Sequence, residues 1–210
     1  MSRLPSQPTR EQVPESEREA FDAVVERQRS LWQGAPRNSD LYFGALLNSP
    51  AMAGTLANLG KFMREGGVRG TYSDADRELV DVVYSVDFGY NAILALHMPD
   101  VVAVGVRIEA VEALWHRREE ELNDDEALLV AFVRAVVAGQ VDDGLFARIV
   151  AHMGVRGAVE YAAFATFLLS TFRLWQALGV PEPSDAEIDE LIASYRRGDG
   201  PAVAAGDRIG

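Results

Sequence analysis

The chain has 210 residues, of which 48% are hydrophobic and 25% charged, and its formal net charge is −12 at pH 7. A chain of this length can bury a substantial core, in one large domain or two small ones. The acidic balance argues against a nucleic-acid partner and against an anionic membrane surface, since both reward clustered basic residues. The sequence contains no cysteine, which excludes disulfides and every thiol-based reaction.

The sequence gives no sign of membrane or export targeting. No apolar run reaches the roughly 18 residues of a membrane span. The first residues are polar and proline-rich, without the apolar segment of a secretory signal. We therefore expect a cytoplasmic protein with no membrane partner.

Apolar residues recur at spacings of three and four along most of the chain, which predicts an all-α fold. After a flexible segment at 1–15, about eight helices are expected, with the last one interrupted at 154–157 and followed by a short acidic helix near 185–197 and a frayed tail from 198. The eight lie near 16–33, 40–48, 50–65, 74–86, 88–98, 107–117, 124–139 and 143–178. We expect one domain at 16–183, made of an N-terminal helical part (16–65) and a core (66–183), with 184–210 as a C-terminal helix and tail.

Several of these helices carry capping signatures. An N-cap residue stands three positions before a glutamate at Ser16, Asn123 and Ser184, and Ser73 begins a weaker version of this box. Asp87 is a plausible N-cap for the helix near 88–98. These signals predict where the helices begin.

Segment 156–178 is apolar on most of its faces, although it contains Glu160 and Arg173. A helix that is hydrophobic all round is buried within a large domain or between subunits. This favours a homo-oligomer (dimer, trimer or hexamer). Arg173 and Glu160 would be costly if buried without partners, so they either pair across the interface or Arg173 contacts a substrate carboxylate.

The most informative spacing joins Glu78, Tyr90, Ile93 and His97. On a straight helix Tyr90 lies about 20° and Ile93 about 40° from His97, whereas Glu78 lies about 100° away. A break near 87–89 would fold the Glu78 segment back beside the helix of His97. The site therefore depends on that break.

This spacing resembles the carboxymuconolactone decarboxylase family, which has an AhpD-like all-helical fold. Peroxidase members of that family carry Glu, eleven residues, Cys, two residues, Cys, three residues and His. Here Glu78 and His97 match the outer positions, while Tyr90 and Ile93 replace the two cysteines. The resemblance covers roughly residues 40–183 and continues downstream with a helix start at Gly105-Val106 that contains Glu109 and Glu112, the segment 141–146, and the stretch from Glu160 to Pro183.

The resemblance implies acid–base work rather than peroxidase chemistry, because a redox dithiol is impossible without cysteine. The decarboxylase branch commonly has a Glu four residues before the His, and here that residue is Ile93. Neither branch's pattern is thus intact, and a chain of this kind is identified as a member that lacks the paired cysteines.

From these residues we expect a lyase or isomerase that needs no cofactor and acts on a small carbonyl- or lactone-type substrate. Glu78 would orient His97, His97 would carry the proton, and Tyr90 would stabilise an oxyanion. Ile93, Glu109 and Arg173 are the expected substrate contacts. No metal is expected, because the three histidines show no ligand spacing. The alternative is a non-catalytic protein that binds small molecules or a partner and kept only the fold, which the apolar Ile93 favours.

Overall fold

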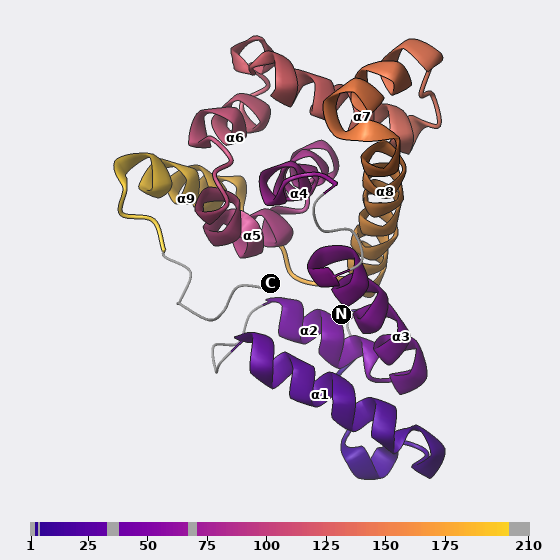
Figure 1. Cartoon of the computed structure of the whole chain (residues 1–210). Coiled ribbons are helices and arrows are strands. Elements are labelled where there is room, and N and C mark those ends of the chain that lie inside the picture. The colour runs from indigo at the N-terminus through magenta and orange to yellow at the C-terminus, as the bar shows by residue number, and fades with distance from the viewer. Residues whose placement is uncertain (1–2, 4, 33–37, 67–70, 202–210) are drawn as a thin grey trace. The chain divides into compact units, whose positions relative to one another are not determined.

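The computed structural model describes residues 3, 5–32, 38–66 and 71–201. Within these residues the chain forms nine α-helices and no β-strand, so the predicted all-α class is confirmed (Figure 1). The chain divides into two compact units: unit 1 draws on residues 1–67 and 173–181, and unit 2 on residues 68–172 and 182–203. The expected single domain at 16–183, with parts 16–65 and 66–183, stays a prediction.

Unit 1 is built from α1 (Arg18–Trp32), α2 (Asn38–Leu46) and α3 (Pro50–Lys61), and a π-helical turn, Phe62–Gly66, extends α3. Its buried side chains include Phe21, Val24 and Tyr42. The Tyr42 ring stacks on Trp175 with centroids 5.3 Å apart. Two 3₁₀ turns, Arg10–Gln12 and Glu15–Glu17, occupy part of the segment expected to be flexible.

Unit 2 is arranged around α4 (Asp74–Phe88), in which every residue from Arg77 to Val86 is buried. Its other helices surround α4 in Figure 1. They are α5 (Asn91–Ala103), α6 (Ile108–Trp115), α7 (Asp124–Ala138), α8 (Asp143–Leu178) as far as residue 172, and α9 (Asp185–Arg197). The Tyr84 hydroxyl of α4 donates to the carbonyl oxygen of Ala165 on α8, 2.8 Å away. Because of this central position, the charged side chains of Arg77, Glu78 and Asp81 on α4 are buried.

Most of the local start and stop signals are confirmed. Ser73, Asn123 and Ser184 each cap a helix through the predicted box. Gly154, with φ 77° and ψ 168°, breaks α8 inside the predicted interval. The frayed tail predicted from 198 lies largely outside the described residues.

Two of the start signals are wrong. Ser16 caps no helix, because it lies inside a 3₁₀ turn that runs directly into α1. Asp87 is not an N-cap, because α4 continues to Phe88 and ends at Gly89, which has φ 70°. The N-cap of the next helix is Tyr90. The break itself lies where the sequence predicts it.

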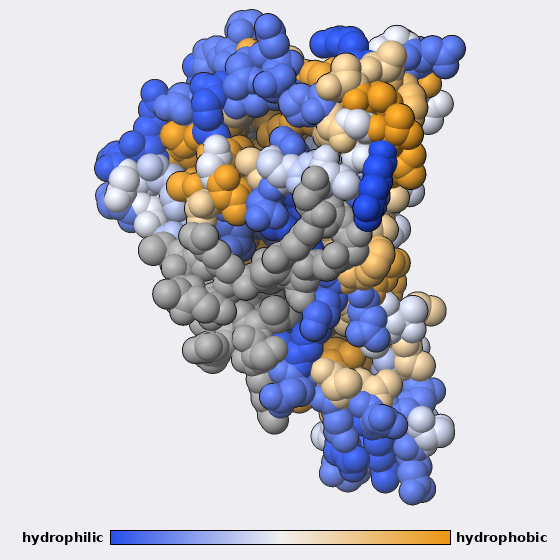
Figure 2. Space-filling view, viewed as in Figure 1, coloured by the Kyte–Doolittle hydropathy of each residue, from blue (hydrophilic) through white to orange (hydrophobic). Residues whose placement is uncertain are grey.

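The face of the molecule in Figure 2 carries many hydrophilic side chains, with hydrophobic side chains between them. Hydrophobic side chains nevertheless reach the surface on α8, where Val155 is 65% and Val159 57% exposed. Among the described residues no helix is both long enough and apolar enough to cross a membrane.

Candidate functional site

The reversal between α4 and α5 brings Glu78 and His97 into contact. Gly89 adopts the left-handed conformation that ends α4, and the chain turns back at Tyr90 so that α5 packs along α4. Nδ1 of His97 lies 2.9 Å from Oε2 of Glu78. The Glu78 side chain is 3% exposed and that of His97 12%. Two residues 19 positions apart thus form a buried acid–imidazole pair.

Arg77 holds the other oxygen of Glu78. Its Nε and one terminal nitrogen each lie 3.2 Å from Oε1 of Glu78, and its Nη1 donates to Asp74 at 3.0 Å. Asp74 is on the first turn of α4 and is largely exposed to solvent. The guanidinium therefore offsets the buried Glu78 charge and directs Oε2 toward the imidazole.

Asp81 is the third acidic group of this cluster. It lies three residues after Glu78, so both carboxylates are on the same side of α4. Its side chain is fully buried, and Oδ1 lies 3.8 Å from Nε2 of His97. The imidazole thus has a carboxylate facing each of its two nitrogens. Glu78, Asp81 and His97 each offer a ligand atom within 4.8 Å of the other two.

The contact with Glu78 defines what His97 can do. A carboxylate that accepts a hydrogen bond from Nδ1–H fixes the neutral ring in the tautomer with its lone pair on Nε2. That nitrogen can then accept a proton or coordinate a cation. The arrangement suits proton transfer or metal binding at Nε2.

Tyr90 is the N-cap of the helix that carries Ile93 and His97, and both Tyr90 and Ile93 are almost fully buried, at 1% and 2% exposed. The Tyr90 ring packs on Phe172 and Phe88, with centroids 5.4 Å and 6.1 Å away. Both predicted residues therefore belong to the packed interior of unit 2 near the start of α5.

Glu109 and Arg173, the other predicted substrate contacts, lie on different elements. Glu109 is about half-exposed on α6, with a carboxylate oxygen 3.9 Å from the guanidinium of Arg196 on α9. Arg173 is exposed in unit 1 and donates to the Gln176 side chain at 3.3 Å. The remaining predicted pair partner, Glu160, accepts hydrogen bonds from Thr71 and Arg156.

Sequence reasoning missed Arg77 and Asp81. The signal available for Asp81 was a single carboxylate inside the apolar run Leu79–Tyr84, three residues after the candidate Glu78. Arg77 gave no such signal, because an arginine on the first turn of an acidic-capped helix is normally solvated. Its burial comes from the packing of α4 at the centre of unit 2.

The N-terminus of α5 is capped by the segment before α9. A carboxylate oxygen of Glu182 accepts a hydrogen bond from the backbone N–H of Ala92 at 2.6 Å. The Asn91 side chain donates to the carbonyl oxygen of Pro183 at 3.0 Å and to Asp185 at 2.8 Å. The Glu182 contact satisfies a backbone donor that Tyr90, which makes no side-chain cap, leaves open, and the Asn91 contacts attach the start of α5 to residues 183 and 185.

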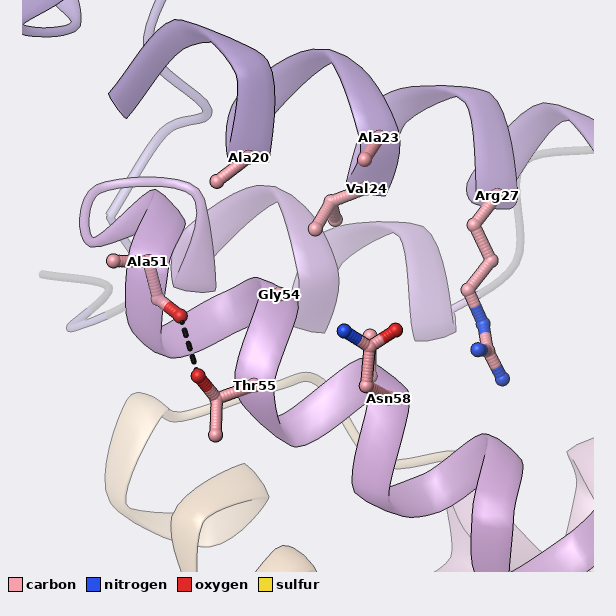
Figure 3. Close-up of a pocket in the computed structure, with 9 residues that line it drawn as sticks. Ala20, Ala23, Val24, Arg27, Ala51, Gly54, Thr55 and Asn58 are labelled. Atoms are coloured by element: carbon pink, nitrogen blue, oxygen red, sulfur yellow. Dashed lines mark hydrogen bonds between the residues drawn. The ribbon is translucent and has the colours of Figure 1, made fainter. Parts of the chain in front are cut away.

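A separate pocket of about 230 Å³ lies between α1 and α3 in unit 1 (Figure 3). Small residues form much of its wall, with Ala20 and Ala23 on α1 and Gly54 on α3, and it also includes Arg27 and Asn58. The Thr55 hydroxyl that borders it is already bonded to the carbonyl oxygen of Ala51, at 2.8 Å. The pocket shares no residue with the Glu78–His97 cluster.

In comparisons with known proteins, neither the family models nor the characterised proteins give a match to this chain. The resemblance to the carboxymuconolactone decarboxylase family therefore stays a prediction from the spacing of Glu78 and His97.

Proposed function

We propose that this protein is a lyase or isomerase that uses acid–base chemistry on a small carbonyl- or lactone-type molecule, as the carboxymuconolactone decarboxylase resemblance implies. The proposal is carried by one observation, the 2.9 Å contact between Oε2 of Glu78 and Nδ1 of His97 in a buried environment. A buried acid–imidazole pair is the arrangement that positions a histidine for proton transfer.

In this mechanism Glu78 accepts the Nδ1–H of His97, and Nε2 removes a proton from the carbon beside the substrate carbonyl. The electron pair of that C–H bond moves onto the carbonyl oxygen, giving an enolate, and Tyr90 donates a hydrogen bond to this oxyanion. His97 then returns the same proton to another carbon or to a leaving oxygen. The reaction is redox-neutral and needs no cofactor, and we place it in a cytoplasmic homo-oligomer.

The first test is turnover of a panel of lactones, β-keto acids and enol lactones by the wild type and by Glu78→Gln. We expect Glu78→Gln to lower kcat by about 10²-fold or more on any substrate that the wild type uses, because general acid–base catalysis contributes on that scale. Asp125→Asn is the matched control, since Asp125 lies 3.5 Å from His152 in an exposed His–Asp pair. Undiminished turnover by Glu78→Gln would contradict the proposal.

The second candidate is a non-catalytic protein that binds a small molecule. It is favoured by Ile93, which places a fully buried aliphatic side chain at a position that is usually polar in both branches of the family. A panel compound that binds in the calorimeter but is returned unchanged, with equal affinity for the wild type and Glu78→Gln, would support this candidate over the enzyme.

A further inference from the structure

The face of His97 opposite Glu78 is directed at a second buried carboxylate. Nε2 of His97 and Oδ1 of Asp81 are 3.8 Å apart, while Nδ1 is held by Glu78. When Nδ1 carries the ring proton, Nε2 presents a lone pair to an acidic oxygen. Two electron-rich atoms that face each other at this distance are stabilised by a positive charge between them.

The burial of Asp81 also favours a bound cation, and this observation does not depend on the position of His97. Asp81 is 0% exposed, and its neighbours Val80 and Val82 on α4 are also fully buried. A carboxylate in such a place costs several kcal/mol unless a cation or strong donors compensate it. One ligand atom each of Glu78, Asp81 and His97 lies within 4.8 Å of the other two, so a cation bound here would lie against buried carboxylate oxygens.

We propose that Asp81 and His97 bind one divalent transition-metal cation, with Glu78 as the outer partner that orients the imidazole. Carboxylate and imidazole ligands lie about 2.0–2.2 Å from zinc, and two such ligands at a near-tetrahedral angle are roughly 3.4 Å apart. The observed 3.8 Å is close to this spacing. A metal-binding histidine usually donates its second N–H to a carboxylate, which is the role that Glu78 has here.

The ligand set also selects the kind of cation. One imidazole with carboxylate oxygens suits zinc, cobalt, manganese or ferrous iron, whereas magnesium and calcium prefer oxygen alone. Water molecules complete the coordination, because the two protein ligands leave positions open.

The cation and the proton compete for the same lone pair on Nε2. A bound cation therefore blocks the base of the proposed mechanism and inhibits turnover. The binding does not depend on the proposed function, whereas the inhibition rests on it.

The test uses the full chain, freed of metal by a chelator and checked for its fold by far-UV circular dichroism. Zn²⁺ binding is measured by titration calorimetry, and Co²⁺ binding by its visible absorption spectrum, which reports the ligand geometry. We expect one equivalent of each ion. Asp81→Asn and His97→Gln should weaken binding at least about tenfold, and Glu78→Gln by about 10–100-fold, as for other outer partners.

His152→Gln is the control, because His152 also faces an aspartate but in an exposed pair. Its binding should equal that of the wild type. If Asp81→Asn does not fold, His97→Gln provides the test, because the His97 side chain is 12% exposed whereas that of Asp81 is fully buried. No bound ion, or binding that is unchanged in His97→Gln or lost in His152→Gln, overturns the metal site.

The two proposals fail in different ways. If Glu78→Gln reduces turnover of the metal-free protein and neither ion binds, the acid–base function holds and the metal site is wrong. If one ion binds through Asp81 and His97 but no panel compound is turned over, the metal site holds and the enzyme proposal is wrong.

Discussion

Arg117 combines an unusual backbone with two specific side-chain contacts. Among the described residues other than glycine it alone has a positive φ, of 59°. Its guanidinium donates to Oδ1 of Asp87 at 2.8 Å and to the carbonyl oxygen of Val86 at 2.7 Å, so it binds the last turn of α4. The contacts hold a residue in a conformation that costs an L-amino acid about 1–2 kcal/mol.

This arrangement predicts different effects for two truncations of Arg117. Both Arg117→Ala and Arg117→Gly lose the contacts with Asp87 and Val86, but only glycine relieves the left-handed backbone. We expect the glycine variant to be the more stable by about 1 kcal/mol, measured as the free energy of unfolding in urea. Equal stabilities would show that the backbone of Arg117 is not strained.

At the scale of the helix, the cap of α5 is the contact most open to test. We expect Glu182→Ala to lower the free energy of unfolding by about 1 kcal/mol, as loss of an N-terminal cap does. Glu182→Gln should lower it less, because the amide oxygen still accepts from Ala92 but lacks the charge that suits a helix N-terminus. Hydrogen exchange at the Ala92 amide provides the local measurement.

Glu190→Ala is the control for this pair of variants. Glu190 lies on α9 with its side chain 72% exposed and forms a surface pair with Arg197. Such a pair contributes little, so its loss should leave both the unfolding free energy and the Ala92 exchange rate unchanged. If Glu182→Ala behaves in the same way, Glu182 does not cap α5.

The helices themselves were predictable because their signals are local. Ser73 and Asn123 each meet their capping partner three residues away, and Gly154 interrupts α8 where the chain carries a glycine pair. The contact between Glu78 and His97 was predictable because their spacing resembles that of a known family and because a chain break was expected near Gly89. The roles of Arg77, Asp81 and Glu182 could not be predicted from the sequence. Burial, and contacts between residues 90 positions apart, depend on how the helices pack.

At the scale of the whole molecule, carboxylates paired with arginine in unit 2 are expected to contribute to acid sensitivity. Asp87 bonds Arg134 at 2.7 Å and Arg117 at 2.8 Å, and Glu119 bonds Arg134 at 2.7 Å. Burial by itself would raise the pKa of Asp87, but the hydrogen bonds from Arg134 and Arg117 outweigh it and lower that pKa below its usual value. The hydrogen bond from Arg134 is the main cause that lowers the pKa of Glu119.

These lowered pKa values predict a loss of stability in acid. A group whose pKa is lower in the folded state stabilises the fold above its unfolded pKa, near 4 for a carboxylate, and loses that contribution as the pH falls through the folded pKa. We expect the free energy of unfolding to fall as the pH drops below about 4. The 20 lysines and arginines then add repulsion, because the 32 carboxylates no longer balance them.

The variant Asp87→Asn separates the contribution of the ion pairs of Asp87 with Arg134 and Arg117 from the repulsion between unbalanced positive charges. This variant should have a lower free energy of unfolding than the wild type at pH 7. The difference between the two free energies should become smaller as the pH falls below 4, because the carboxyl group of the wild type then becomes neutral too. If the difference in the free energy of unfolding stays constant with pH, the charge of Asp87 does not contribute to stability. Urea unfolding at a series of pH values gives the comparison.

The cap on α5 also has a consequence for the order in which the protein matures. A ribosome releases α4 and α5 long before residues 182–185, which close the N-terminus of α5, have been made. The Ala92 amide at the start of the helix that carries His97 therefore lacks its carboxylate acceptor until Glu182 has been made. We expect the Ala92 amide hydrogen to exchange faster in ribosome-bound chains that stop before Glu182 than in chains that include it, so that the first turn of α5 becomes fully hydrogen-bonded only late in translation.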